Sequence, residues 1–398
     1  MGGILGAPLY RPGGTMLVAA IDPDVYLKST RTQNRMIRIL VQNLAGTLGG
    51  GATIKRIAGH RLQIDSDRPD AAERAARVFG VSAIEHVEVV PITDLDTLAD
   101  AIAEQTAPVV DGHTFAVRPR RIGTHDWTSQ DLAIAVGSRL TARGNRVDLS
   151  HPEVTVKVRI VDQTAYLTRS VTPAVGGLPL RTQGKALVLF SGGIDSPVAA
   201  FEVARRGVEV DYLHFSFGCG QADHAAGIAH GVWEQYGAGS QADLIVVEFE
   251  HAASEIPKRV QPRDRQMALK SAMYRTAERI AGDDPAIRAL VTGEALGQVS
   301  TQTLDNLVAL DRVVDIPVLR PLLTFDKTAI RQRAEAIGTY DLSARTRELC
   351  DISGGARVAT SMRHEHLRGV GEGLEDLIAD AVATAKRTRL ADWMPGTH

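Results

Sequence analysis

Cysteine is almost absent from this sequence, which has only Cys219 and Cys350 among 398 residues. Two thiols exclude a disulfide framework and indicate a reducing compartment. Long apolar runs are also missing, because no stretch approaches the roughly 18 residues that span a bilayer, and nothing resembles a signal peptide. We therefore expect a cytoplasmic protein that does not bind membranes.

A strong charge of either sign is missing as well. Lysine and arginine number 45 against 47 acidic residues, for a formal net charge of -2. The chain therefore lacks the overall basic character of a nucleic-acid coat, and any such surface must be local. Its apolar and charged fractions, 44% and 23%, are those of a globular protein. The length predicts two or three domains.

Two small modules are expected before residue 171. The first module spans residues 1–78. Together with a last strand at 84–90, it has the βαββαβ order of a ferredoxin-like fold. Its helix after Thr30 carries an apolar stripe at helical spacing, which we expect to pack on the sheet. The stripe consists of Met36, Ile37, Leu40, Leu44 and Leu48. A second α+β module is expected over residues 79–170, with an alternating strand at 154–160. Residues 171–184, rich in proline and glycine, are the predicted linker.

The pattern changes after residue 184. Short apolar runs at 187–190, 208–215, 244–249 and 289–292 alternate with helical segments. Continuous apolar strands of this kind are typical of a parallel sheet covered by helices on both faces. We therefore expect a doubly wound α/β domain over residues 185–398.

The sequence SGGIDS follows the first of these strands. We predict that Ser196 caps a helix, that Pro197 is its first residue, and that Gly207 ends it. Free N–H groups and the helix dipole favour an anion at such a helix start. The lysine of a Walker motif is missing, so transfer of a γ-phosphate is not indicated. An ordinary glycine-rich turn is the simpler alternative.

The loop instead has the pattern of enzymes that split ATP between its α and β phosphates. In such a loop the small polar residues bind the departing pyrophosphate, and a carboxylate holds Mg²⁺ against it. The predicted pyrophosphate ligands are Ser191, Gly192, Gly193 and Ser196, and the predicted magnesium ligand is Asp195.

Three further segments accompany the loop in order. They are LVTGEALGQVSTQTLDNL (290–307), VLRPLLTFDK (318–327) and AIGTYD (336–341). Together with FSGGIDSPVAAF they resemble the tRNA 4-thiouridine synthetase family. Upstream, GHTFAVRPRRIGTHDWTSQDL (112–132) is similar to the THUMP domain of that family, and YLKSTRTQNRM (26–36) to its N-terminal ferredoxin-like domain. The resemblance covers nearly the whole chain.

The resemblance implies both a domain order and a reaction. Residues 1–78 would form the N-terminal ferredoxin-like domain, 79–170 the RNA-binding THUMP domain, and 185–398 the pyrophosphate-loop sulfurtransferase domain. ATP would adenylate O4 of uridine 8 in tRNA, and persulfide sulfur would displace AMP to give 4-thiouridine. Adenylation converts a poor leaving oxygen into a good one. The alternatives are another adenylating tRNA-modifying enzyme, such as a 2-thiouridylase or a tRNA-lysidine synthetase, and a THUMP tRNA-binding protein without catalysis.

The resemblance also implies the residues that hold ATP. Lys327 would stabilise charge on the phosphates during adenylation, although a solvated lysine is the alternative. His214 would flank the adenine with Phe215, or serve only as a satisfied histidine at a strand end. Lys270 stands where many family members have arginine. Lysine keeps the positive charge of arginine but lacks its planar guanidinium group. The remaining implied contacts are Leu189, Phe190, Gly293 and Gln302.

The two cysteines are the candidates for sulfur transfer. Cys350 lies where the family has a catalytic cysteine, and nearby Arg345 and Arg347 favour its thiolate. We expect Cys219 to pair with it, one thiol carrying sulfur and the other resolving the persulfide. An inert Cys219 and a zinc site with two histidines, His224 and His230, are the alternatives. Two thiols are too few for an iron–sulfur cluster, so no cluster is expected. The spacing of the zinc alternative fits no standard pattern, so zinc is not expected either.

Some family members carry a C-terminal rhodanese domain, which receives the persulfide and is associated with thiamine thiazole synthesis. Because the chain ends at His398, we expect neither that domain nor that role. The expected sulfur source is a cysteine desulfurase or another persulfide donor, and a homodimer is suggested by the family.

Two local basic clusters are candidates for binding tRNA. Cationic side chains position a phosphate backbone without reading sequence. The clusters are Arg118, Arg120 and Arg121 in the THUMP-like segment, and Lys28, Arg31 and Arg35 near the first helix. The alternative is a solvated charged face. The acceptor stem of tRNA is the expected ligand, recognised by its shape.

Overall fold

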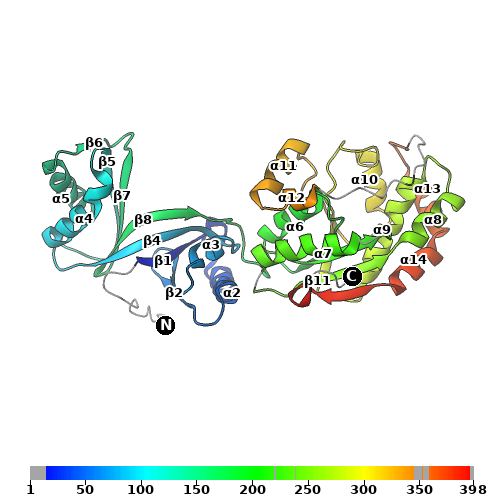
Figure 1. The fold of residues 1–398 in the computed structure, drawn as a ribbon, viewed down its shortest axis with the longest axis horizontal. Helices are drawn as coiled ribbons and strands as arrows, with labels where there is room; N and C mark the ends of the chain where they lie inside the picture. Colours follow the sequence, from blue (N-terminus) through cyan, green and yellow to red (C-terminus); the bar gives the residue numbers. More distant parts are fainter. Residues whose placement is uncertain (1–14, 219–220, 238, 345–351, 353–357, 395–398) are drawn as a thin grey trace. The chain divides into compact units, whose positions relative to one another are not determined.

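The computed structural model describes residues 15–218, 221–237, 239–344, 352 and 358–394 (Figure 1). It divides into two compact units. One unit contains the residues up to Asn34 and from Leu44 to Gly176, and the other contains Arg35–Asn43 and the chain from Gly177 onward. Each unit is built around one β-sheet.

The first unit begins with the predicted ferredoxin-like module. Its elements are β1 (Thr15–Ile21), α1 (Pro23–Tyr26), α2 (Thr30–Leu48), β2 (Thr53–Ile57), β3 (Arg61–Asp65), α3 (Ala71–Ala76) and β4 (Val81–Pro91). The strands pair in the antiparallel order β2-β3-β1-β4. All five residues of the apolar stripe on α2 are buried, which confirms the predicted amphipathic helix.

The THUMP-like module continues the same sheet. Its elements are α4 (Leu95–Val110), β5 (Thr114–Ile122), α5 (Ser129–Ala142), β6 (Arg146–Val147), β7 (Val154–Val161) and β8 (Thr164–Pro173). Helix α5 begins with a reciprocal capping box between Thr128 and Asp131. Helices α4 and α5 bury one face of β5, β7 and β8. Because β8 pairs with β4 along its whole length, the two modules share one eight-stranded sheet.

The start of the predicted linker belongs to this sheet. Val171 and Pro173 lie in β8 and pair with Glu85 and Ala83 of β4. The domain boundaries within the continuous sheet stay a prediction.

The second unit has the predicted doubly wound architecture. Its strands are β9 (Lys185–Leu189), β10 (Glu209–Ser216), β11 (Asp243–Glu248), β12 (Ile287–Val291), β13 (Val318–Leu319) and β14 (Lys386–Arg389), in the order β13-β12-β9-β10-β11-β14. All neighbours are parallel except β11 and β14. The main helices are α6 (Asp195–Arg205), α7 (Gln221–Val232), α8 (Glu250–Arg259), α9 (Arg265–Gly282), α10 (Leu304–Asp311), α11 (Lys327–Ala336), α13 (His364–Glu372) and α14 (Glu375–Ala383).

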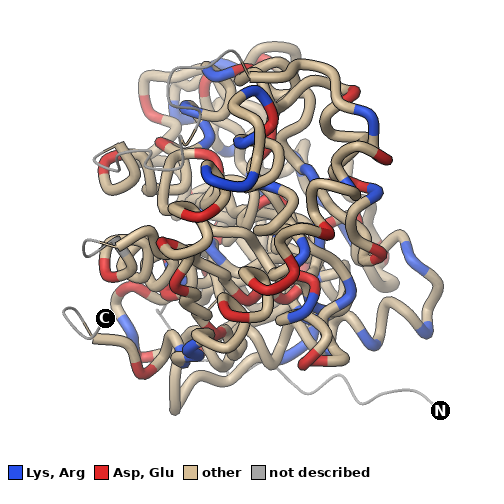
Figure 2. The backbone as a smooth tube through the Cα atoms, turned by 90° about the vertical axis from the view of Figure 1, so that its right-hand side faces the viewer, with Lys and Arg blue, Asp and Glu red and all other residues tan. Residues whose placement is uncertain are grey.

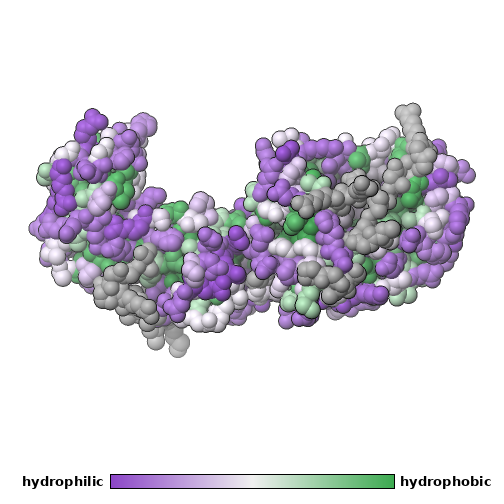
Figure 3. All heavy atoms as spheres, viewed as in Figure 1, coloured by the Kyte–Doolittle hydropathy of each residue, from purple (hydrophilic) through white to green (hydrophobic). Residues whose placement is uncertain are grey.

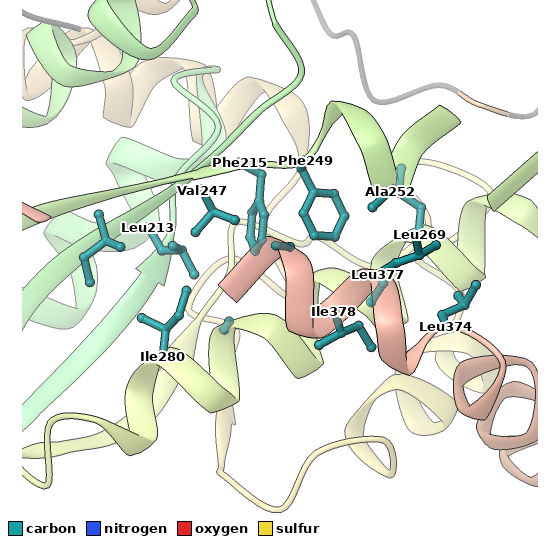
Figure 4. Close-up of a cluster of buried hydrophobic side chains, with 14 of the residues drawn as sticks. Leu213, Phe215, Val247, Phe249, Ala252, Leu269, Ile280, Leu374, Leu377 and Ile378 are labelled. Carbon is teal, nitrogen blue, oxygen red and sulfur yellow. The ribbon is translucent and has the colours of Figure 1, made fainter. Parts of the chain in front are cut away.

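Helices cover both faces of this parallel sheet. The crossovers through α6 and α7 lead from β9 to β10 and on to β11, while the crossover through α8 and α9 leads back to β12. Right-handed crossovers in opposite directions place their helices on opposite faces. On the α9 face, Leu213 and Val247 belong to one buried apolar cluster with Ile280 of α9 and Ile378 of α14 (Figure 4).

The surface of the molecule agrees with its balanced composition. Lysine and arginine are interspersed with aspartate and glutamate along the chain (Figure 2). Hydrophilic residues dominate the face shown in Figure 3, and hydrophobic ones show between them in small patches. Among the described residues, no helix has the length and apolar character needed to cross a bilayer.

Candidate nucleotide and RNA sites

The strand order of the second unit reverses at β9. Strand β10 lies on one side of β9 and strand β12 on the other, and both are parallel to it. In open α/β sheets, ligands bind in the crevice outside the carboxyl ends of the strands at such a reversal. The SGGIDS loop follows β9, and the TGEALGQ segment follows β12. Two motifs about 100 residues apart therefore meet at one edge of the sheet, where Gly293 lies against Asp195.

The SGGIDS loop is closed by its own hydroxyl groups. The backbone N–H of Ser191 donates to Oγ of Ser196 at 3.2 Å, and the N–H of Gly193 donates to Oγ of Ser191 at 3.2 Å. The two hydroxyl oxygens lie 3.3 Å apart. These bonds hold the loop in a tight turn immediately before α6.

The predicted helix cap is wrong. Helix α6 begins at Asp195, because Ile194 already has helical backbone angles (φ -63°, ψ -37°). Ser196 is therefore the second helical residue and Pro197 the third, where a missing N–H still costs no helical bond. The Ser196 hydroxyl, freed from capping, closes the loop instead. The predicted end of the helix is confirmed: α6 stops at Arg205, and Gly207 has φ +88°.

Gly192 combines a left-handed backbone with close packing. Its φ is +76°, and a Cβ there would lie 3.3 Å from the Cα and Cβ of Ala225 in α7. Both the conformation and the contact favour glycine. Helix α7 thus backs the loop at Gly192.

Gly293 brings the two motifs into contact. A Cβ at this position would lie 2.9 Å from Cβ of Asp195 and 3.1 Å from N of Ser196. The resemblance implied that Gly293 approaches the nucleotide; the structure places it against the start of α6. From the same segment, Nε2 of Gln298 donates to Oδ2 of Asp195 at 3.3 Å.

His214 lies at the carboxyl end of β10, beside the loop. One ring nitrogen, Nδ1, is 2.9 Å from the carbonyl oxygen of Phe190. Nε2 is buried and has no hydrogen-bond partner among the described residues. Burial lowers the pKa of this imidazole, so it is neutral at pH 7.

The structure does not bring Phe215 to the same side as His214. Neighbouring residues of a strand point to opposite faces. The Phe215 ring packs in the apolar cluster under α9 and α14, edge-on to Phe249 with centroids 4.9 Å apart (Figure 4). Leu189 is partly buried against the same cluster, and Phe190 is buried edge-on to Tyr212.

A buried charge cluster surrounds Glu294. Its carboxylate accepts from Nζ of Lys270 at 2.8 Å and from Nε of Arg320 at 2.9 Å. Burial alone would raise its pKa, but the two cations lower it to about 2. Lys270 was expected from the sequence, whereas Glu294, Arg320 and Gln298 were not. All three could have been found from the sequence, because they lie inside the segments 290–307 and 318–327 that resemble the family.

Lys327 and Gln302 end up in different environments. Lys327 is exposed as the first residue of α11, whose N-cap Asp326 accepts from N of Ala329 at 2.8 Å. Gln302 is buried, and its Oε1 has no partner within the described part of the chain. The contact of Gln302 with the nucleotide stays a prediction.

The residues predicted for sulfur transfer are the two cysteines and the two arginines near Cys350. Cys219, Cys350, Arg345 and Arg347 lie outside the described residues. Their roles stay predictions. Of the two histidines of the alternative zinc site, the ring of His230 contacts those of Trp233 and Trp393.

The basic residues of the THUMP-like module fall on two faces of its sheet. Arg118 and Arg120 alternate along β5 and are exposed on the face away from α4 and α5. Arg121 points to the other face, where its guanidinium lies 5.9 Å from the Trp127 ring. Lys157 of β7 pairs with Arg118 and is also exposed, so it joins the first face. The alternation in 154–160 could have identified Lys157.

The predicted basic residues near the first helix are all exposed. Arg31 and Arg35 are one turn apart on α2, and Lys28 precedes the helix. The spacing places the two arginines on one helix face.

Comparison with known families agrees with this arrangement. The family described as thiamine biosynthesis protein (ThiI) matches residues 181–370, and the THUMP domain family matches residues 92–169. Fold, site and these matches define an enzyme of the pyrophosphate-loop class that carries a THUMP domain.

Individual relatives specify the family. A tRNA sulfurtransferase of Desulfurococcus amylolyticus is 37% identical over 366 residues, which cover 90% of this chain and 75% of the relative. That of Marinobacter nauticus is 34% identical over 390 residues, 94% of this chain and 80% of the relative. The chain therefore belongs to the tRNA sulfurtransferase family.

Solved structures show the same fold. One described as a 4-thiouridine synthetase–RNA complex with bound ATP aligns with a TM-score of 0.82 at 25% identity, covering 94% of this chain and 99% of that chain. PH1313 from Pyrococcus horikoshii aligns with a TM-score of 0.61 at 20% identity and supports the fold alone.

Proposed function

We propose that this enzyme adenylates O4 of uridine 8 in tRNA with ATP and replaces that oxygen by persulfide sulfur, giving 4-thiouridine. The proposal is based mainly on one observation: the SGGIDS and TGEALGQ segments meet where the strand order of the sheet reverses, in a chain that also has a THUMP module. The solved 4-thiouridine synthetase with RNA and ATP, which aligns over 94% of this chain, supports it.

In the first step the loop binds the leaving group. The N–H groups at the start of α6 and the hydroxyls of Ser191 and Ser196 are suited to the β and γ phosphates. Oxygen O4 attacks the α-phosphorus, the bond to the β-phosphate oxygen breaks, and pyrophosphate leaves. Lys270 and Lys327 supply positive charge for the phosphates as this bond breaks.

The residues at the loop fit a magnesium ion. Mg²⁺ is usually held by one or two carboxylates together with substrate phosphates, and Asp195 supplies a carboxylate at the start of α6. When bound, the ion would neutralise charge on the pyrophosphate. Gln298, by donating to Oδ2 of Asp195, orients that carboxylate.

In the second step sulfur replaces the activated oxygen. The terminal sulfur of a cysteine persulfide attacks C4, and AMP leaves with O4, so that tRNA is held by a disulfide. The second cysteine attacks the cysteine sulfur of that bond, which releases 4-thiouridine and forms a Cys219–Cys350 disulfide. A cellular thiol then reduces the disulfide. The persulfide comes from a cysteine desulfurase or a similar donor, without an iron–sulfur cluster or zinc.

The basic face of Arg118, Arg120 and Lys157 supports binding of tRNA by the first unit. Exposed cations on a sheet surface contact phosphates without reading bases. A cytoplasmic location and a homodimer are part of the same proposal.

Incubation with unmodified tRNA, MgATP and sulfide, followed by nucleoside mass spectrometry, tests the reaction. We expect ATP-dependent 4-thiouridine in wild type and at least about a hundredfold less with Asp195→Asn. Formation of 2-thiouridine would favour the alternative of a 2-thiouridylase, and tRNA binding without any modified nucleoside would favour the non-catalytic alternative.

A persulfide-donor assay tests the cysteines separately. Cys350→Ser and Cys219→Ser should each abolish turnover with a cysteine desulfurase and cysteine, yet retain thiolation with free sulfide. Full donor-dependent turnover by Cys350→Ser would refute its assignment, and full turnover by Cys219→Ser would favour an inert Cys219.

A further inference from the structure

The Glu294 carboxylate is the meeting point of three elements. It is 6% exposed and directly follows Gly293 after β12. Oε1 accepts from Nζ of Lys270 at 2.8 Å, and Oε2 accepts from the Tyr274 hydroxyl at 2.6 Å and from Nε of Arg320 at 2.9 Å. Lys270 and Tyr274 belong to α9, one turn apart, and Arg320 directly follows β13.

The two cations of this cluster are bound differently. Arg320 has a second carboxylate, since Nη1 lies 2.7 Å from Oδ1 of Asp311, and its side chain is only 7% exposed. Lys270 is 20% exposed, and Glu294 is its ion-pair partner within the described chain. An ammonium has three donors. Lys270 can therefore keep its bond to Glu294 and still donate to a bound ligand.

Glu294 is also linked to the loop through its chain neighbour. Its neighbour Gly293 packs against Asp195 and Ser196, so closely that a Cβ at position 293 would lie 2.9 Å from Cβ of Asp195. A shift of Glu294 would therefore displace both Lys270 and the backbone that touches the loop. The carboxylate is charged at neutral pH, because its pKa is lowered to about 2.

We propose that Glu294 is a positioning residue of the nucleotide site, which holds the Lys270 ammonium towards the phosphates through the bond at Oε1. This inference rests on the proposed binding of ATP. It assigns Arg320 and Tyr274 the task of fixing the other carboxylate oxygen, so that Oε1 stays directed at Lys270.

A double-mutant cycle between Glu294 and Lys270 tests the assignment. Glu294→Gln, Lys270→Gln and the double variant are compared with wild type by KM for ATP, kcat and equilibrium binding of ATP. Loss of one charge-assisted hydrogen bond predicts about a tenfold higher KM for ATP in each single variant. The double variant should show no more than the larger single effect, because both changes remove the same contact. KM for tRNA should not change.

The control is Glu335→Gln, which removes an exposed ion pair with Arg331 on α11. It should keep the wild-type KM for ATP. An unchanged KM in Glu294→Gln, or independent effects that multiply to about a hundredfold in the double variant, would overturn the inference.

If Glu294→Gln does not fold, Glu294→Asp replaces it in the same cycle, because it keeps the charge but withdraws the carboxylate from Lys270. The same two outcomes decide. The proposed function is tested separately, and it is refuted if wild type forms no 4-thiouridine with ATP. If wild type is active but the effects of the Glu294 and Lys270 substitutions are independent, only the role of Glu294 is refuted.

Discussion

Gly293 touches Asp195 at the sheet reversal, so closely that a Cβ at position 293 would lie 2.9 Å from the Cβ of Asp195. This contact joins the two segments that make the nucleotide site, one after β9 and the other after β12. The site therefore depends on a backbone contact as much as on its polar side chains.

Gly293→Ala should distort the nucleotide site by overpacking the contact between its two segments. The added methyl group must push the start of α6 away, and overpacking of this kind costs about 1–3 kcal/mol. We expect that decrease in the free energy of unfolding, measured with urea, together with at least about tenfold slower ATP-dependent thiolation. Gly369→Ala in α13 is the control, because a Cβ there meets nothing within 4 Å. Equal behaviour of the two variants would contradict the prediction.

Ser196→Ala should loosen the pyrophosphate loop. The N–H of Ser191 loses its acceptor, and removal of a hydrogen bond of this kind costs about 1 kcal/mol. We expect a higher KM for ATP with little change in KM for tRNA, measured by steady-state kinetics. Ser254→Ala, which removes an exposed hydroxyl bond on α8, is the matched control. A wild-type KM for ATP in Ser196→Ala would mean that the loop does not need this closure.

Gln substitutions of Arg118, Arg120 and Lys157 should weaken tRNA binding in a salt-dependent way. For each cation that no longer neutralises a phosphate, the slope of log K against log salt should fall by about one. Affinity measured by filter binding at several salt concentrations gives this slope, and ATP binding should not change. Arg143→Gln, on an exposed residue at the end of α5, serves as control. An unchanged slope in the triple variant would exclude this face.

The burial of His214 should make stability depend on pH. Its folded pKa is lowered, so the unfolded chain binds a proton near the ordinary value of 6.5 while the folded chain does not. Protonation thus favours the unfolded state, and the free energy of unfolding should fall as pH drops below about 6.5. His214→Gln should flatten this dependence in urea titrations between about pH 7 and pH 5, whereas exposed His251→Gln should not. An identical pH profile for wild type and His214→Gln would contradict it.

Much of the fold was predictable because local patterns carry it. The stripe on α2 and the apolar runs of the parallel strands reflect helix and strand periods, which are properties of neighbouring residues. The start of α6 was not predictable to the residue, because a good capping residue at Ser196 competed with the helical backbone of Ile194. Closure of the loop by Ser196 stabilises the longer helix.

By itself, the sequence determined the type of chemistry: a glycine- and serine-rich loop before a helix binds phosphates, and its companion segments mark a tRNA-modifying family. Only the tertiary structure decided which groups act together. Glu294 meets Lys270 and Arg320, and Gln298 meets Asp195, because the chain returns from β11 to place β12 beside β9. That strand order is set by packing across the whole sheet, and no local pattern of residues encodes it.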